Sequence, residues 1–399
     1  MRLYIITPIY ATTTSMQGAT PIVHYFAREW VKMGHEVTVF QFVALYPGPM
    51  YWIGKHFQHQ LNTHLGMLVP VEKPKNGDYE AEGVIVHKRC LKKFRPHSRY
   101  NRTRLAEAVD FVVSEIEKFG VPNWFVGHWD NPQLELLYML KKRFNKPTCL
   151  VFHSNDFNIA AKYGDQGQDM LMSLDVIGFR SLIGQRNFEA KYGKPHHSFI
   201  ASSGVSEEFI SAGKQVQKII KSSAHSFIYV GSLIKRKYPS LIISALSKIY
   251  PDGDFSMTFI GDGAEKRVIE EEYLKTGARG EVRFIGRIPR KEIIKYLKQA
   301  DVFVMISKGE IFGLVYLEAM AMGVVPIGSK NEGIDGIIVD GENGFLCEAG
   351  NEDELAEVLK RIKEMPSARF EEISKRARQT AMEYSDELVA KKYLNSLVL

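Results

Sequence analysis

The chain has 399 residues, of which 45% are hydrophobic and 25% charged, and its formal net charge is +6. This length favours two or three domains, each large enough to bury a core, and the positive charge favours an anionic partner. The three cysteines (Cys90, Cys149 and Cys347) are far apart and form no CxxC motif, which argues against a disulfide or zinc framework and for a reducing compartment.

The N-terminus turns polar too early for a signal peptide, and no run approaches the ~18–20 apolar residues that cross a membrane. We therefore expect a cytoplasmic protein, with the inner face of the membrane as one place of action. Residues 2–6 predict a strand, residues 20–33 a helix with one apolar face, and residues 34–40 a second strand. This order predicts a parallel sheet with right-handed crossovers. No G-x-G-x-x-G follows the first strand, which disfavours a nicotinamide dehydrogenase.

Residues 42–71 lose the periodicity and are rich in aromatic residues and histidines. Long loops inside compact domains are usually functional or disordered, so we expect this segment to be a lid on the acceptor side. Its histidines, His56, His59 and His64, have no carboxylates at metal-ligand spacing, which favours surface histidines over a metal site.

A strongly basic stretch covers residues 84–105, with eight Lys or Arg and no Asp or Glu. It is either a solvated face or, between Lys88 and Arg104, a surface that docks on anionic lipid head groups or on a pyrophosphate-bearing acceptor. Nucleic-acid binding is disfavoured because no recognition module accompanies the stretch.

Histidines follow two of the next predicted strands. His128 ends the strand near residues 123–126, and His153 ends the strand at residues 148–152. Ligands gather at the carboxyl ends of strands in open α/β sheets, so both histidines are candidates for a site. A satisfied core histidine is the alternative, and it fits His128 better than His153.

A second alternation of strands and helices starts at residues 226–230. Gly231 ends this strand, and Lys235, Arg236 and Lys237 precede a helix predicted at residues 239–250. Three consecutive cations at a strand end are well placed to hold a diphosphate, although a solvated basic turn has the same composition.

The stretch from Ser307 to Asp335 is the most informative one in the chain. It predicts a Gly-flanked loop, a helix at residues 313–322 and a strand at residues 324–328. The loop presents backbone N–H groups at a helix N-terminus, which suits a phosphate, yet it carries Glu310 and is followed by Glu318. Acids beside an anion site make sense when they bind hydroxyls. A sugar nucleotide offers both phosphates and hydroxyls.

Glu310 and Glu318 stand seven residues apart within E-I-F-G-L-V-Y-L-E-A-M-A-M-G. This pattern resembles the E-x7-E signature of retaining GT-B glycosyltransferases of family 4. The resemblance is dense from about residue 226 to residue 359 and looser before Gly204. It implies an α/β protein with two Rossmann-like domains facing a central cleft. The implied domains are residues 1–205 for the acceptor, residues 206–380 for the nucleotide sugar, and a helix at residues 381–399 that crosses back to the first domain.

The resemblance also implies roles for individual residues. Glu310 would bind the hydroxyls of the transferred sugar, Glu318 the ribose hydroxyls, and Lys237 the diphosphate. Ser232 stands where the family has an arginine in G-R-L-x-x-x-K-G, so we expect Arg236 or Lys235 to replace it. His153, in V-F-H-S-N-D, would lie against the donor sugar. The remaining donor contacts are expected at Gly18, Gly231, Gly261, Gly263, Arg287, Ile288, Phe312, Gly313 and Leu314.

The implied reaction is a retaining transfer of a hexose or N-acetylhexosamine from a nucleoside-diphosphate sugar, most readily a UDP-sugar, to a sugar or a lipid-linked acceptor in cell-envelope polysaccharide or glycolipid synthesis. The resemblance implies no metal and no cofactor besides this substrate, and no nucleic-acid partner. Two alternatives stay open. One is a non-catalytic GT-B subunit that binds nucleotide sugar or glycan, motivated by Ser232 and Gln17. The other is a sugar-nucleotide epimerase or hydrolase on the same scaffold.

Overall fold

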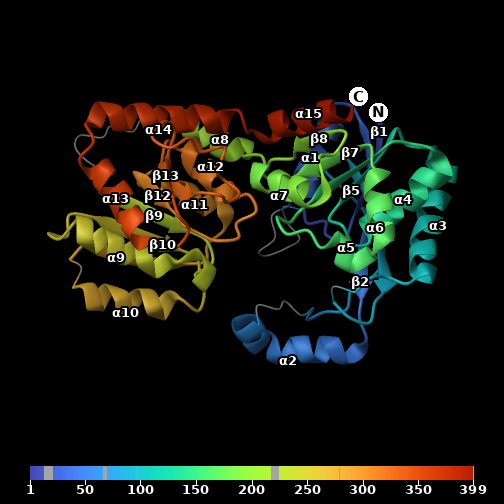
Figure 1. Cartoon of the computed structure of the whole chain (residues 1–399), viewed down its shortest axis with the longest axis horizontal. Helices are drawn as coiled ribbons and strands as arrows, with labels where there is room; N and C mark the ends of the chain where they lie inside the picture. Colours follow the sequence, from blue (N-terminus) through green and yellow to red (C-terminus); the bar gives the residue numbers. More distant parts are fainter. Residues whose placement is uncertain (13–20, 66–69, 97, 217–223, 278, 399) are drawn as a thin grey trace. The chain divides into compact units, whose positions relative to one another are not determined.

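A computed structural model describes residues 1–12, 21–65, 70–96, 98–216, 224–277 and 279–398 (Figure 1). The chain divides into two compact units. Unit 1 contains residues 1–180, 184–201 and 390–399, and unit 2 contains residues 181–183 and 202–389. The chain therefore returns to unit 1 at its C-terminal end, where the indole nitrogen of Trp30 donates a hydrogen bond to the carbonyl oxygen of Ala390 at 3.0 Å.

Unit 1 is built on a sheet of eight strands in the order β3-β4-β2-β1-β5-β6-β7-β8, counted over the described residues. Every pairing is parallel except that of β3 with β4, as the repeated alternation of strand and helix predicts. The strands are β1 Arg2–Thr7, β2 Glu36–Leu45, β3 Gly77–Ala81, β4 Val84–Lys92, β5 Trp124–His128, β6 Thr148–Phe152, β7 Val176–Phe179 and β8 Ser198–Ile200.

The helices of this part of the chain connect the strands. Buried apolar residues line the faces of α1, α3 and α4, which is why these segments fold as amphipathic helices against a sheet. The helices are α1 Ile22–Lys32, α2 Gly48–Leu65, α3 Arg102–Phe119, α4 Gln133–Phe144, α5 Ile159–Tyr163, α6 Asp165–Met172 and α7 Leu182–Tyr192.

The prediction of a long aromatic loop over residues 42–71 is wrong. β2 continues to Leu45, and α2 occupies most of the remaining stretch, away from the other helices of unit 1 in Figure 1. Pro49 stands in the first turn of α2, where proline favours a helix start. Tyr51 is buried, but Trp52 and Phe57 are 58% and 44% exposed, so the aromatic residues of this helix do not form one buried face that the sequence pattern would reveal.

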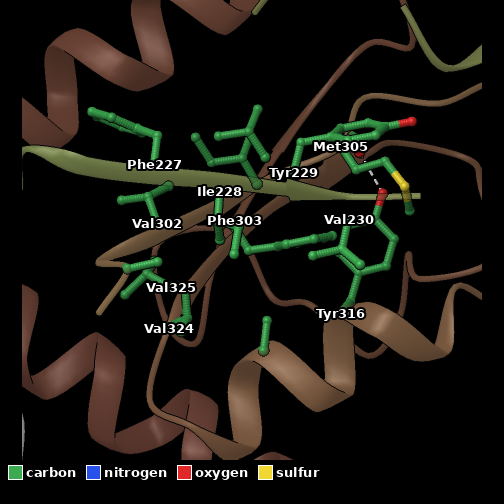
Figure 2. Close-up of a cluster of buried hydrophobic side chains, with 14 of the residues drawn as sticks. Phe227, Ile228, Tyr229, Val230, Val302, Phe303, Met305, Tyr316, Val324 and Val325 are labelled. Atoms are coloured by element: carbon green, nitrogen blue, oxygen red, sulfur yellow. Dashed lines mark hydrogen bonds between the residues drawn. The ribbon is translucent and has the colours of Figure 1, made fainter. Parts of the chain in front are cut away.

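Unit 2 is built on an all-parallel sheet of six strands, counted over the described residues, in the order β11-β10-β9-β12-β13-β14. Figure 2 shows its centre, where side chains of β9 and β12 pack against Tyr316. The elements are α8 Glu207–Lys214, β9 Ser226–Val230, the 3-10 turn η1 Lys235–Lys237, α9 Pro239–Ile249, β10 Ser256–Ile260, α10 Lys266–Thr276, β11 Glu281–Gly286, α11 Arg290–Leu297, β12 Val302–Val304, α12 Leu314–Ala321, β13 Val325–Ser329, β14 Phe345–Cys347, α13 Glu352–Lys363 and α14 Ser367–Met382. The last helix, α15 Asp386–Leu397, begins in unit 2 and continues into unit 1 from Ala390.

The residues at the end of α12 and directly after it are apolar because they lie in the core of unit 2. Met320, Met322 and Val324 are completely buried, and the Tyr316 hydroxyl donates a hydrogen bond to the carbonyl oxygen of Met305 (Figure 2). Gly323 has φ +69°, which lets the chain leave the helix and enter β13 after two residues. The helix that carries Glu318 is therefore fixed on every side by core contacts.

Candidate functional site

The predicted donor-binding residues of unit 2 come from the carboxyl ends of four neighbouring strands. β11, β10, β9 and β12 lie next to one another in the sheet and run parallel. The loops after them carry the candidates, and the parallel order brings these loops to one edge. This edge is where open α/β sheets bind their ligands.

Two of these loops touch each other through their backbones. The Leu233 amide donates a hydrogen bond to the Asp262 carbonyl oxygen at 3.0 Å. A Cβ added to Gly261 would lie 1.9 Å from the carbonyl oxygen of Gly231, and one added to Gly263 would lie 2.2 Å from that of Leu233. Both glycines are thus required for packing of the loops, a role that the sequence pattern alone did not indicate.

The cationic turn lies against the acidic loop. The Lys237 ammonium lies 3.2 Å from Oε2 of Glu310, and Nη1 of Arg236 lies 3.8 Å from the same atom. Arg236 also donates a hydrogen bond to the Lys308 carbonyl oxygen at 3.0 Å, and the Lys308 amide donates one to the Arg236 carbonyl oxygen at 2.8 Å. Lys235 is exposed. The structure therefore brings Lys237, Arg236 and Glu310 together.

Glu332 organises the same loop, and the sequence reasoning missed its role. Its carboxylate accepts hydrogen bonds from the backbone amides of Gly309 at 2.9 Å and Glu310 at 2.7 Å. The Gly333 amide donates back to the Glu310 carbonyl oxygen at 2.9 Å, and a Cβ on Gly333 would lie 2.3 Å from the backbone of Ile311. The amides of Gly309 and Glu310 are thus already engaged by a side chain, whereas the amides predicted to bind phosphate are those near Phe312 and Gly313.

Glu318 is 4% exposed and pairs with Arg290, the first residue of α11. Burial raises the pKa of the Glu318 carboxyl, and the Arg290 guanidinium opposes that rise. Arg290 stands close in sequence to Arg287 and Ile288, in the loop predicted to meet the nucleobase. No spacing rule links Arg290 to Glu318, so this pair has no signature in the sequence.

The other candidates of unit 2 divide into core and exposed positions. The Phe312 side chain is buried in the core, Leu314 and Ile288 pack partly against that core, and Arg287 is exposed. Gly313 caps α12 with φ +76°, a left-handed conformation that favours glycine. Phe312 can therefore meet a ligand only through its backbone, which is where the predicted anion-binding amides lie.

His153 lies in unit 1, at the carboxyl end of β6. Its ring stacks on Trp129 with centroids 3.8 Å apart, and its Nε2 lies 2.9 Å from Nδ1 of His128. Trp129 has φ +66°, which is unusual for a residue other than glycine. Burial lowers the pKa of His128 to about 3 and also lowers the pKa of His153, to which His128 adds a repulsive contribution. Both rings are therefore neutral at pH 7.

The hydrogen bond between the two rings defines their tautomers. Nε2 of His128 is buried and has no hydrogen-bond partner among the described residues. A buried N–H without an acceptor is costly, so we assign the His128 proton to Nδ1, which then donates to His153. His153 must in turn carry its proton on Nδ1. Nδ1 of His153 is therefore a hydrogen-bond donor.

The lowered pKa of His128 predicts that the free energy of unfolding depends on pH. The pKa of His128 is lower in the folded state than its ordinary value of 6.5, so the unfolded state binds the proton more tightly. The contribution of His128 to the free energy of unfolding is fully present above pH 6.5. It is lost as the pH falls below 6.5, by up to about 1.4 kcal/mol per pH unit. Urea unfolding between pH 7 and 5 should show this fall, and His128→Gln should flatten it. The exposed His196→Gln is the matched control, and an unchanged slope in His128→Gln would contradict the assignment.

Three of the eight cations in the basic stretch after residue 84 pair with carboxylates. Arg89 pairs with Asp78 at 2.6 Å, Arg99 pairs with Glu135 at 2.6 Å, and Arg104 pairs with Glu107. Lys92, Arg95 and Arg102 are exposed, whereas Lys93 is buried. The stretch therefore offers a smaller free positive surface than its composition predicts.

Three further findings concern Gly18, membrane-spanning helices and metal ligands. Gly18 lies outside the described residues. Across residues 1–12, 21–65 and the later described ranges, no helix is both long and apolar enough to span a membrane. The same residues contain no group of three or more histidines, cysteines and acids that could hold a metal ion.

Two parallel Rossmann-like sheets, with the last helix returning to the first unit, define a GT-B fold. Solved structures of this fold superpose on the whole chain. A glycosyltransferase of Rickettsia africae matches with a TM-score of 0.71 and 16% identity, covering 99% of this chain and 97% of its own. HepE of Anabaena, solved in complex with UDP, matches with a TM-score of 0.67 and 15% identity, and both chains are fully covered.

The sequence comparisons find related proteins. Residues 214–380 match the family described as Glycosyl transferases group 1, so the resemblance of this part of the chain to GT-B glycosyltransferases is confirmed. The N-acetyl-alpha-D-glucosaminyl L-malate synthase of Bacillus anthracis is 32% identical over 138 residues, which cover 35% of this chain and 36% of the relative. An uncharacterized glycosyltransferase of Methanocaldococcus jannaschii is 25% identical over 291 residues, which cover 70% of this chain and 75% of the relative.

Proposed function

We propose that this protein is a retaining glycosyltransferase that moves a hexose or an N-acetylhexosamine from a nucleoside-diphosphate sugar to an acceptor hydroxyl. The observation that carries the proposal is the contact of Lys237 and Arg236 with Glu310 at the ligand-binding edge of unit 2. A diphosphate needs cations and a hexose needs hydroxyl acceptors. This edge offers both within one group of side chains.

The cations supply most of the catalysis in this proposal. Breaking the anomeric bond leaves negative charge on the diphosphate and positive character on the sugar ring. Fixed cations aimed at the diphosphate stabilise that separation without having to reorganise. Lys237 is suited to this role because its side chain is only 12% exposed and already oriented by Glu310. Arg236 takes the place of the arginine that the family has at Ser232.

The two glutamates bind hydroxyls in this proposal. Glu310 takes hydroxyls of the transferred sugar, and its negative charge lies on the side where the ring becomes cationic. Glu318 takes the ribose hydroxyls. Its carboxylate can accept about four hydrogen bonds, so the pairing with Arg290 leaves capacity for a ribose. In unit 1, His153 acts as a neutral donor toward the sugar through Nδ1.

UDP is the proposed nucleotide. Two structures of the same fold support this choice by what they contain: HepE in complex with UDP, and a trehalose-6-phosphate protein of E. coli bound with UDP-2-fluoro glucose. A role in cell-envelope synthesis has support from one relative, named as the lipopolysaccharide core biosynthesis glycosyltransferase LpsE of Rhizobium meliloti. We propose the cytoplasm as the compartment because all three cysteines are free thiols.

The test is release of nucleoside diphosphate from UDP-, GDP- and ADP-sugars by the purified chain, with and without a panel of acceptors. We expect acceptor-dependent release and a product of retained anomeric configuration. Glu310→Gln should lower kcat/KM by about 10²-fold or more, because it removes the charge but keeps the shape. Binding of nucleotide sugar without turnover would instead indicate a non-catalytic subunit. Turnover without an acceptor would indicate a hydrolase or an epimerase.

A further inference from the structure

Lys93 is a buried lysine that the proposed mechanism does not use. It follows β4 directly, is 9% exposed, and its ammonium group lies 4.6 Å from the centroid of the Tyr100 ring. Across the described residues, its side chain makes no ion pair with a carboxylate. Burying a lysine in this way is costly, and burial together with the charge of Lys162 lowers its pKa to about 8.

The surroundings of Lys93 carry an excess of positive charge. Lys162 and Asp130 are the charged groups that act on it, and these two already pair with each other at 2.6 Å. The neighbouring Arg99 is matched by Glu135 at 2.6 Å. Lys93, Lys162 and Asp130 therefore carry one positive charge in excess. Lys93 is buried, and Lys162 and Asp130 are partly buried.

The cluster lies where a ligand of unit 1 is expected. Lys93 follows the carboxyl end of β4, and Asp130 follows the carboxyl end of β5, in a sheet where both strands run parallel to β1 and β2. Asn131, which follows β5, donates a hydrogen bond at 2.9 Å to the carbonyl oxygen of Ser98, a few residues after Lys93. This is also the edge that carries His153.

We propose that Lys93 and Lys162 form a binding site for an anionic group, a phosphate or a carboxylate, on the acceptor. The anion supplies the missing charge. The two ammonium groups lie 4.6 Å and 5.8 Å from the ring centroids of Tyr100 and Tyr163, respectively. Tyr163 is buried and its hydroxyl donates a hydrogen bond to the Asp130 carbonyl oxygen at 3.1 Å. The acceptor role rests on the proposed function, whereas the anion site itself does not.

The first test measures anion binding by thermal unfolding of the full chain, without donor or acceptor. Potassium phosphate and potassium succinate are compared with potassium chloride at equal ionic strength. We expect at least one of the two anions to raise Tm by about 2 °C or more, because a ligand that binds only the folded state stabilises it. No shift with either anion would overturn the proposal. The anion that acts identifies the ligand as a phosphate or a carboxylate.

The second test assigns the site to Lys93. Lys93→Met removes the charge and keeps the length, so the anion-dependent shift should disappear while Tm without anion stays equal or rises. Lys93→Arg should retain the shift. Lys92→Met, on the exposed neighbour, is the matched control and should also retain it. A Lys93→Met protein that keeps the shift, or that loses several degrees of Tm without anion, would show that Lys93 is only structural.

The third test connects the site to catalysis. With sugar phosphates and hydroxy acids as acceptors, Lys93→Met should raise KM for the acceptor about 10-fold or more and leave KM for the nucleotide sugar unchanged. Nucleoside diphosphate binding, measured separately by calorimetry, reports on unit 2 alone. An unaltered chain that binds nucleoside diphosphate but neither anion would therefore refute this inference without touching the proposed function.

Discussion

Lys237→Met is expected to lower kcat/KM by about 10²–10³-fold and to weaken the binding of nucleoside diphosphate. The ammonium group of Lys237 is largely buried and fixed beside Glu310, so no solvent reorganisation is needed when charge develops on the diphosphate. Methionine keeps the length of the side chain and removes only the charge. Steady-state kinetics with nucleotide sugar and acceptor measure the effect, and Lys275→Met on the exposed face of α10 is the control.

Lys237 and Glu310 should also be coupled. Because they act on the same substrate from one contact, the double variant Lys237→Met/Glu310→Gln should be about as slow as the slower single variant. Its free energy of unfolding should exceed that of Lys237→Met, since no partly buried carboxylate loses its lysine. Effects on kcat/KM that multiply across the two sites would contradict a shared role.

Arg290→Met is expected to lower the free energy of unfolding of unit 2 by about 3 kcal/mol, because breaking a buried pair leaves a charge in the interior. The Glu318 side chain is 5% exposed and that of Arg290 is 32% exposed. Without the arginine, the more deeply buried carboxylate of Glu318 therefore has no cationic partner. Glu318→Gln should cost less, because the guanidinium can still reach water. Urea unfolding followed by circular dichroism measures both.

The pH dependence of Arg290→Met provides its control. Burial raises the pKa of Glu318, and without Arg290 nothing opposes that rise. A carboxyl whose pKa is raised in the folded state contributes stability at low pH that is lost as the pH increases. The loss of free energy of unfolding caused by Arg290→Met should thus be smaller at pH 5 than at pH 8. The double variant Arg290→Met/Glu318→Gln should show no such difference. A deficit independent of pH would mean that lost packing, not the stranded charge, causes it.

Much of the fold follows from local patterns. The strand at Ser226–Val230 and the helix that begins at Pro239 were both predicted as part of the alternation of strands and helices. α2 was missed because Trp52, Ile53 and Phe57 in its first turns are exposed, so burial imposed no helical period on this part of the sequence. Pro49 in its first turn was the available signal.

The partners within the site could not be predicted in the same way. Glu332 lies 22 residues after the amide of Glu310 that it binds, and Arg290 lies 28 residues before Glu318. Such pairs depend on how the loops meet in three dimensions, and neither has a characteristic spacing. The same is true of Gly261 and Gly263, whose role in the contact between two loops appears only when both strands are in place.

The most direct test is a crystal structure with the nucleoside diphosphate that binds best in a calorimetric screen. The proposed function requires an oxygen of the terminal phosphate within hydrogen-bond distance of Nζ of Lys237, with the nucleobase at the loop of Arg287 and Ile288. A diphosphate bound elsewhere on the chain, or one held at this edge without Lys237, would contradict it.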